Sequence, residues 1–166
     1  MSKVNGKSKG SNFERKIANA LSERFKDFLG IEKGFRRNPD SGSFFGGQNE
    51  SRTETYGTEF AIFGDLICPK SFLFSVECKH YKSPPSFQSF LNADVKEWDV
   101  WIKQAEQDSK KSSKKMLLII KYNNVSEFAI TDFKIENCRL CFHYKEKFAY
   151  KFEDILLLEN LFFFKP

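Results

Sequence analysis

The sequence predicts a single α/β domain in which helices flank a mixed central β-sheet. Its 166 residues suit one domain, and 40% hydrophobic residues with 20 phenylalanines supply the apolar volume for a core. Segments with helical periodicity and segments with strand periodicity follow one another as helix, strands, helix, strands and helix. This order favours an α/β sandwich around one mixed sheet.

The first expected helix covers residues 11–29. Phe13, Ile17, Leu21, Phe25 and Phe28 recur at helical spacing, and Gly30 stands where a helix C-cap belongs. Residues 1–10 are rich in Lys, Gly and Ser, which predicts a flexible basic arm ahead of a single folded domain over 11–166. The segment "IEKGFRRN" then predicts a first strand, and the polar residues 39–59 predict a loop.

The next two segments, "FAIFGDLICP" and "SFLFSVECKHY", are rich in strand-forming residues and are separated by a Pro-Lys turn. This pattern predicts a hairpin. Alternation along its second strand places Val76 and Cys78 on a core face and Glu77 and Lys79 on the opposite face, toward a cleft. A hairpin with so short a turn would bring Asp65 across from Glu77.

The second half of the chain predicts one more helix and several strands. An apolar stripe that includes Val95, Trp98 and Ile102 indicates a helix over 93–108, with Gln104 beside the stripe. "MLLIIKY" predicts a buried strand, and Asn123 begins a turn. Further strands are expected near 126–131, 138–144 and 148–152, and an apolar helix from 153.

Composition excludes several classes of protein. No apolar run reaches the roughly 18 residues that span a bilayer, and no signal peptide is visible, so we expect no membrane partner and a cytoplasmic location, or the host cytoplasm for a viral protein. The four cysteines are expected to be buried free thiols. The alternative is a four-cysteine zinc site made by Cys68, Cys78, Cys138 and Cys141.

The net charge of +5 comes from the N-terminal end of the chain. The first 40 residues hold 10 basic and 5 acidic side chains, which leaves 17 of each in the remainder of the 27 and 22. Such a segment serves either as a solubilising tail or as a contact for a phosphate backbone. Charge alone leaves both interpretations open.

Asp65, Glu77 and Lys79 form the first candidate site. Glu77 and Lys79 alone could be a simple salt bridge. Two carboxylates at close range, however, repel each other unless a cation lies between them. Mg²⁺ is the natural cation, with Mn²⁺ as a substitute, because it takes oxygen ligands and keeps waters that reach a substrate phosphate. Lys79 could then orient the attacking water or stabilise charge on the phosphoryl group.

The pattern Asp65, then Glu77-Cys78-Lys79, resembles the D…(D/E)-x-K motif of the PD-(D/E)xK nuclease superfamily, although Gly64 stands where that superfamily often has proline. Two segments upstream resemble archaeal-type Holliday junction resolvases. "KGSNFER" is similar to their K-G-S-x-x-E-R segment, with Glu14 as the matching glutamate, although Ser11 and Glu14 also form a helix capping box. "RNPDSGS" is similar to their R-x-P-x-S-G-S segment, although it reads equally as a turn.

The resemblance, which covers residues 9–79, implies a restriction-endonuclease-like sandwich and a set of roles for its residues. Glu14, Asp65, Glu77 and the Cys78 carbonyl would hold the metal. The remaining catalytic roles would go to residues that orient water or the phosphate: Lys79, Arg37, Ser41, Ser43 and Gln104. Candidates for contacts to the DNA backbone are Lys9, Arg36, Arg37, Tyr81 and Lys82. His80 and His143 are expected to be bystanders.

Three functions remain open at this level. The first is a Mg²⁺-dependent endonuclease, working as a homodimer, that resolves four-way DNA junctions in recombination and repair. The second is a nuclease of the same superfamily that acts on other DNA, such as branched, damaged or restriction-type targets. The third is a DNA-binding module without catalysis, which the clustered carboxylates argue against.

Overall fold

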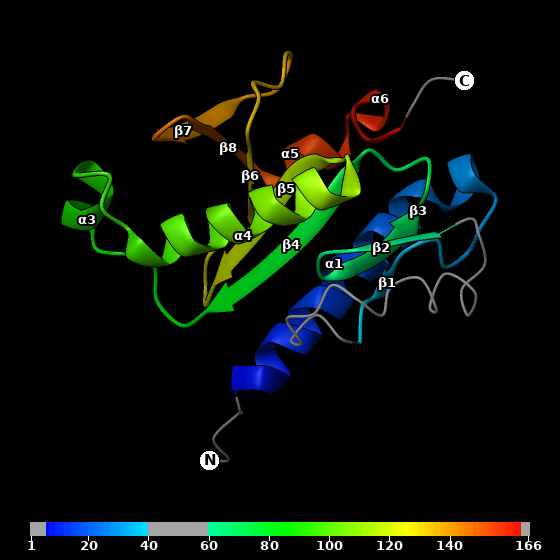
Figure 1. Cartoon of the computed structure of the whole chain (residues 1–166), viewed down its shortest axis with the longest axis horizontal. Helices are drawn as coiled ribbons and strands as arrows, with labels where there is room; N and C mark the ends of the chain where they lie inside the picture. The colour runs from blue at the N-terminus through cyan, green and yellow to red at the C-terminus, as the bar shows by residue number, and fades with distance from the viewer. Residues whose placement is uncertain (1–5, 40–59, 164–166) are drawn as a thin grey trace.

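The computed structural model describes residues 6–39 and 60–163 and confirms a mixed α/β architecture. The main sheet has five strands in the order β4-β5-β6-β8-β7 (Figure 1). Only β4 and β5 run parallel, and the other neighbours are antiparallel, so the sheet is mixed as predicted. The strands are β4 (Phe74–Tyr81), β5 (Lys115–Tyr122), β6 (Phe128–Thr131), β7 (Leu140–Tyr144) and β8 (Lys147–Lys151).

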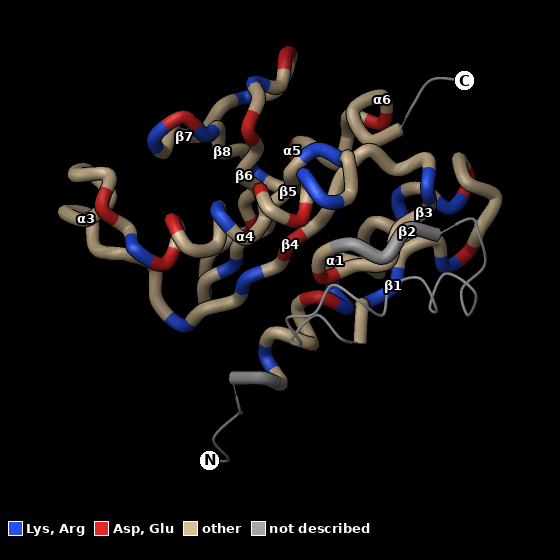
Figure 2. Tube along the Cα trace, in the orientation of Figure 1, with Lys and Arg blue, Asp and Glu red and all other residues tan. Residues whose placement is uncertain are grey.

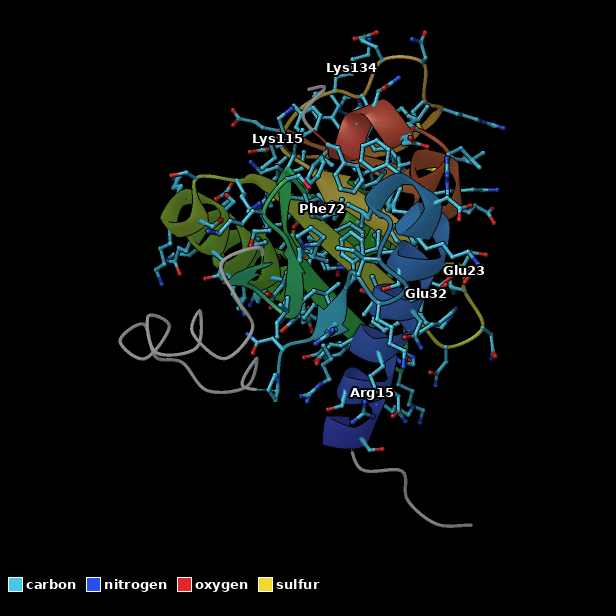
Figure 3. The ribbon with its side chains drawn as sticks, turned by 90° about the vertical axis from the view of Figure 1, so that its right-hand side faces the viewer. Arg15, Glu23, Glu32, Phe72, Lys115 and Lys134 are labelled. Carbon is cyan, nitrogen blue, oxygen red and sulfur yellow. The ribbon has the colours of Figure 1, made fainter. Side chains whose placement is uncertain are left out.

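The two long helices, α1 (Gly6–Leu29) and α4 (Lys96–Ser112), cover opposite faces of this sheet (Figures 1 and 3). Alternation along β5 explains this arrangement. Leu117 and Ile119 join the core beneath α1, whereas Leu118 and Ile120 join a second core beneath α4. Each face of the strand therefore packs against one helix.

Helix α1 begins at Gly6 rather than at Ser11. The predicted start is wrong, and residues 6–10, expected to belong to the arm, form the first part of the helix. Ser11 consequently lies inside the helix and cannot be its N-cap, which removes the capping box as the reason for Glu14. The apolar stripe was predicted correctly as far as Phe25, since Ile17, Leu21 and Phe25 are buried, but its last residue, Phe28, is 48% exposed.

A second, three-stranded sheet packs beside the edge of the first. It has the order β1-β3-β2, with β1 (Arg36–Arg37), β2 (Phe60–Phe63) and β3 (Leu66–Pro69) all antiparallel. The expected hairpin between residues 60–69 and β4 is therefore wrong. Residues 60–69 fold back on themselves at Gly64 and Asp65, while β4 pairs with β5 and leaves its other edge facing the small sheet.

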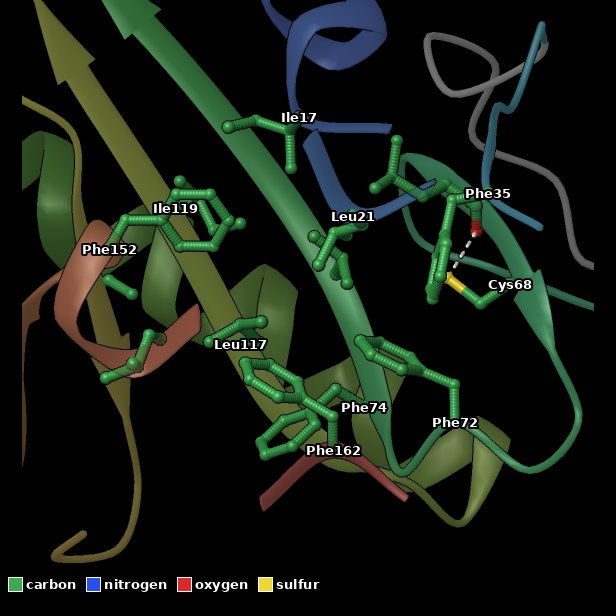
Figure 4. Packing of buried hydrophobic residues seen from close by; sticks show 14 of the residues in the cluster. Ile17, Leu21, Phe35, Cys68, Phe72, Phe74, Leu117, Ile119, Phe152 and Phe162 are labelled. Carbon is green, nitrogen blue, oxygen red and sulfur yellow. Dashed lines mark hydrogen bonds between the residues drawn. The ribbon is translucent and has the colours of Figure 1, made fainter. Parts of the chain in front are cut away.

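Short helices complete the chain: α3 (Phe87–Leu91), α5 (Phe152–Leu156) and α6 (Glu159–Phe162). The expected C-terminal helix is thus two short ones. Ile155, Phe162 and Phe163 are buried in the core that contains Phe25 and Phe72, and Phe72 stacks on Phe162 with ring centroids 5.6 Å apart (Figure 4). The apolar surplus of this segment mostly serves the chain's own core.

No helix in residues 6–39 or 60–163 is long and apolar enough to cross a membrane. Cys68 and Cys78 are buried as expected, but Cys141 is exposed because β7 lies at the edge of the main sheet. All four cysteines are described, and they do not gather into a group that could hold a metal ion. The alternative four-cysteine zinc site is therefore wrong.

Candidate active site at the edge of strand β4

Asp65 lies against the free edge of β4. Its backbone N–H donates to the Val76 carbonyl at 2.8 Å, and its carboxylate Oδ2 accepts from the Cys78 N–H at 2.8 Å. Asp65 and Glu77 are 4% and 2% exposed, so both carboxylates are buried at the same edge. The predicted proximity of the two is correct, but it arises from the turn between β2 and β3 and not from a hairpin.

Gly64 allows this approach. Its φ of +68° is in the left-handed region, and a Cβ at this position would stand 2.4 Å from the Val76 carbonyl oxygen. Proline, which fixes φ near −65°, could not adopt this conformation. The departure from the superfamily's common proline is therefore required by the backbone of this chain.

Glu77, Lys79 and Gln104 form one hydrogen-bonded group on the α4 face of the sheet. Glu77 Oε1 accepts from Lys79 Nζ at 2.5 Å and from Gln104 Nε2 at 2.6 Å. Gln104 Oε1 in turn accepts from Lys79 Nζ at 3.2 Å. The amide of Gln104 thus holds both members of the ion pair, as expected from its place on the facing helix.

Glu14 reaches the site from α1 and pairs with Arg37, whose Nε lies 2.5 Å from Glu14 Oε2. Asn38 fastens this part of the chain to the site, because its backbone N–H donates to the Asp65 carbonyl at 2.8 Å and its Nδ2 to the Gly64 carbonyl at 3.0 Å. We did not predict a role for Asn38. Its position next to Arg37 in "RNPDSGS" was the available signal.

The electrostatics of the site are dominated by burial. Burial, reinforced by the charge of Glu77, raises the pKa of Asp65 well above its usual value, although the Cys78 N–H opposes the rise. Burial likewise raises the pKa of Glu77, against the opposing charge of Lys79. Burial disfavours the Lys79 ammonium, but the charge of Glu77 and their hydrogen bond outweigh it and raise the pKa of Lys79. Lys79 is therefore a charged hydrogen-bond donor rather than a proton acceptor.

The carboxylates suit a divalent cation. Glu77 Oε2 is buried and, among the described residues, has no hydrogen-bond partner, which is costly for a carboxylate oxygen. The Cys78 N–H faces Asp65, and its carbonyl faces the same edge because both groups of a strand residue point to one side. Within residues 6–39 and 60–163, no three acidic, histidine or cysteine side chains already form a metal cage. Arg37 and Lys79 instead engage Glu14 and Glu77.

The other predicted residues lie around this centre or outside the described chain. Acidic and basic positions adjoin one another on β4 and on α1 (Figure 2). Lys9 lies in α1, Arg36 in β1, and the exposed Tyr81 and Lys82 at the end of β4. Ser41 and Ser43 lie outside the described residues.

The two histidines stand apart from the carboxylates. The His80 ring packs on Phe13 of α1, with centroids 5.6 Å apart, which places it on the face opposite to Lys79. His143 packs on Phe148 in the distant β7 and β8 pair. Both histidines therefore lie away from the candidate catalytic residues, as expected.

Asp108 on α4 is a site neighbour that sequence reasoning missed. Its negative charge contributes to the raised pKa of Glu77, and burial raises the pKa of Asp108 itself. Asp108 stands one helical turn after Gln104, so the i, i+4 spacing on α4 was the signal that could have found it.

Comparison with known proteins places the chain in a family. A family model described as "Phage putative PDDEXK endonuclease" matches residues 5–158, which include Glu14, Asp65, Glu77 and Lys79. This match agrees with the PD-(D/E)xK superfamily and with a restriction-endonuclease-like sandwich, but it does not support closeness to the archaeal junction resolvases. No curated protein and no solved structure matches the chain.

Proposed function

Because the chain belongs to the family of phage PDDEXK endonucleases, we propose that it is a metal-dependent endonuclease that hydrolyses phosphodiester bonds in DNA at the edge of β4. One observation carries the proposal. The buried Glu77 Oε2, which has no hydrogen-bond partner among the described residues, belongs to a carboxylate near the buried Asp65 and paired with the ammonium of Lys79, an arrangement that is costly unless a cation and a phosphate engage it.

In this proposal Asp65, Glu77 and the Cys78 carbonyl hold Mg²⁺ or Mn²⁺, and Glu14 joins them when it leaves Arg37. A bound divalent ion would lower the pKa of a water and polarise the phosphoryl oxygen. The Lys79 ammonium donates to the attacking water or to the charge that develops on the phosphate. Gln104 fixes the Lys79 Nζ, since it is hydrogen-bonded to both members of the ion pair.

Arg37 has a second role in the proposal. Its guanidinium pairs with the Glu14 carboxylate in the free protein. When DNA binds, the guanidinium would leave Glu14 and bind the substrate phosphate, which also offers two oxygen acceptors side by side. Ser41 and Ser43 would support the same phosphate. Metal binding and DNA binding would then strengthen each other, because each frees a partner that the other needs.

The test of this function uses a closed circular DNA, which only an endonuclease can nick. We expect nicking by the wild-type protein with Mg²⁺ or Mn²⁺, none with EDTA, and none by Glu77→Gln. A circular dichroism spectrum of Glu77→Gln that matches the wild type would show that the variant is folded. Nicking that persists in EDTA would contradict the metal site, and an inert wild-type protein on all DNA would contradict the function.

For the substrate, we propose four-way junctions cut by a homodimer, because two symmetry-related strands must be cut and a two-fold dimer presents two identical sites. The support is the likeness of residues 9–15 and 37–43 to junction resolvases. The apolar residues of α5 and α6 give this proposal no separate support, since Ile155 and Phe162 are buried within the chain.

Light scattering and paired cleavage assays test this finer proposal. A dimer that cuts a four-way junction faster than linear duplex of the same sequence is expected. A monomer that cuts both equally would leave an endonuclease acting on other DNA, such as branched or restriction-type targets.

Gln104→Leu is expected to lower the rate of DNA cleavage about 10- to 100-fold, the range seen when a residue that orients a catalytic group is removed. The variant keeps the helix but leaves Lys79 and Glu77 without the amide that joins them. Gln107→Leu, an exposed change on the same helix, is the control. Equal rates for the two variants in a single-turnover assay would contradict a positioning role for Gln104.

Lys9→Ala and Lys82→Ala are each expected to weaken DNA binding and to reduce the slope of log affinity against log salt by about 0.9 for each phosphate that is no longer neutralised. Lys134→Ala is the control, because Lys134 is exposed and lies at the opposite end of the molecule from Arg15 (Figure 3). Fluorescence anisotropy over a salt series measures the slopes. A slope equal to that of the wild type would show that the substituted lysine does not contact the DNA backbone.

A further inference from the structure

Tyr81 is an exposed aromatic residue on the same strand face as the candidate catalytic residues. It is the last residue of β4, and strand alternation places it with Glu77 and Lys79 on the face that meets α4. The Cα atoms of Lys79 and Tyr81 are therefore about 6.6 Å apart along the strand. Tyr81 is 47% exposed although most of β4 is buried.

Trp101 of α4 supports the Tyr81 ring from behind. The two ring centroids are 4.6 Å apart at an interplanar angle of 45°, and Trp101 is only 5% exposed. Trp101 stands one turn before Gln104 on the same helix, so α4 positions both the Tyr81 ring and the Lys79 ammonium. One side of the Tyr81 ring is thus packed on a buried neighbour, and the remainder is open to solvent.

Among residues 8–39 and 64–163, the other exposed phenylalanine and tyrosine rings lie elsewhere. Phe28 packs on Phe163 near the far end of α1, and Phe87 belongs to the short helix α3. Tyr81 alone among these three lies on the strand that carries Glu77 and Lys79. An aromatic ring that packs on a buried neighbour on one side and is exposed on the other is the platform on which a nucleobase stacks.

A base inside a continuous duplex cannot use such a platform unless it is first extruded, because both of its faces are already stacked. Lys79 and Tyr81 are next to each other on one face of β4, about 6.6 Å apart at their Cα atoms. A base that meets Tyr81 would accordingly belong to a nucleotide close to the phosphate at Lys79.

We propose that Tyr81 stacks on an unpaired nucleobase beside the scissile phosphate and so directs cleavage to DNA with unpaired bases next to the cut. This inference rests on the proposed nuclease function and names the structural feature of its substrate. The exposed Lys82 that follows would contact the phosphate of the same nucleotide.

The first experiment measures stacking without cleavage. DNA with 2-aminopurine in a short bulge is titrated with wild-type, Tyr81→Phe, Tyr81→Ala and Phe28→Ala protein in EDTA. Stacking on Tyr81 predicts quenching of the 2-aminopurine by all except Tyr81→Ala, because phenylalanine keeps the aromatic face. Phe28→Ala is the matched control, since it also removes a half-exposed ring that packs on one aromatic neighbour.

The second experiment compares cleavage of the bulged DNA with that of a fully paired duplex of the same sequence. Tyr81→Ala is expected to lower kcat/KM about tenfold more on the bulged DNA than on the paired duplex, a difference equivalent to about 1.4 kcal/mol. Equal losses on both DNAs, or a loss for Tyr81→Phe as large as for Tyr81→Ala, would overturn the inference.

The two proposals fail in different ways. No quenching by the wild-type protein, together with normal cleavage in Mg²⁺, would overturn the role of Tyr81 and leave the nuclease intact. Quenching that depends on Tyr81, together with no cleavage of any DNA, would support the stacking site and overturn the nuclease.

Discussion

Asp65→Asn is expected to lower DNA cleavage by about a thousandfold or more and at the same time to raise the melting temperature of the metal-free protein. Asparagine keeps an oxygen that can accept from the Cys78 N–H, so the turn at Gly64 is preserved. It removes a buried negative charge that the Cys78 N–H and the Lys79 ammonium balance only in part. The catalytic loss and the gain in stability have the same cause.

The sign of the stability change follows from the raised pKa of Asp65. A carboxyl group whose pKa is higher in the folded protein than in the unfolded chain favours folding while it is protonated, and this contribution is lost as pH rises through the folded-state value. Near neutral pH the wild-type carboxylate therefore opposes folding. Its removal should stabilise the metal-free protein by about 1 kcal/mol, which raises the melting temperature by roughly 2–4 °C for a chain of this size.

Melting curves with and without divalent metal provide the measurement. Mg²⁺ or Mn²⁺ should raise the melting temperature of the wild type and have little effect on Asp65→Asn, because a ligand stabilises only the folded state that binds it. Asp132→Asn, an exposed change, should alter neither cleavage nor melting. Full cleavage activity in Asp65→Asn would remove Asp65 from the metal site.

Gly64→Ala is expected to destabilise the protein by about 3 kcal/mol and to lower its melting temperature by roughly 6–12 °C. Alanine here would combine the strain of a positive φ with a Cβ only 2.4 Å from the Val76 carbonyl oxygen. That oxygen belongs to the backbone and cannot move without shifting β4. Asp65 would be displaced with it, so cleavage should also be lost.

Gly30→Ala separates the two causes. Gly30 has nearly the same φ, +63°, but a Cβ added there would have no atom within 4 Å, so alanine costs only the strain of about 1–2 kcal/mol. Urea denaturation of both variants gives the comparison. Equal losses of stability would show that the approach of Gly64 to β4 is looser than the structure describes.

The contacts of the site differ in how far the sequence could predict them. Alternation along residues 74–81 correctly placed Glu77 and Lys79 on one face, because a strand has a fixed two-residue period whatever it pairs with. The same reasoning, with the helical period of α4, correctly placed Gln104 opposite them. Asp65 was also predicted to lie near Glu77, but through the wrong strand pairing.

By itself, the sequence determined most of the buried apolar residues of α1, β4 and α4, since apolar periodicity acts within a few residues along the chain. Only the tertiary structure decided that β4 pairs with the distant β5 and leaves its other edge to Asp65. Strand partners are chosen by long-range packing on both faces of a sheet, and no local pattern encodes that choice. The ion pair between Arg37 and Glu14 could not be predicted for the same reason. It joins two segments that meet only when the small sheet docks on β4.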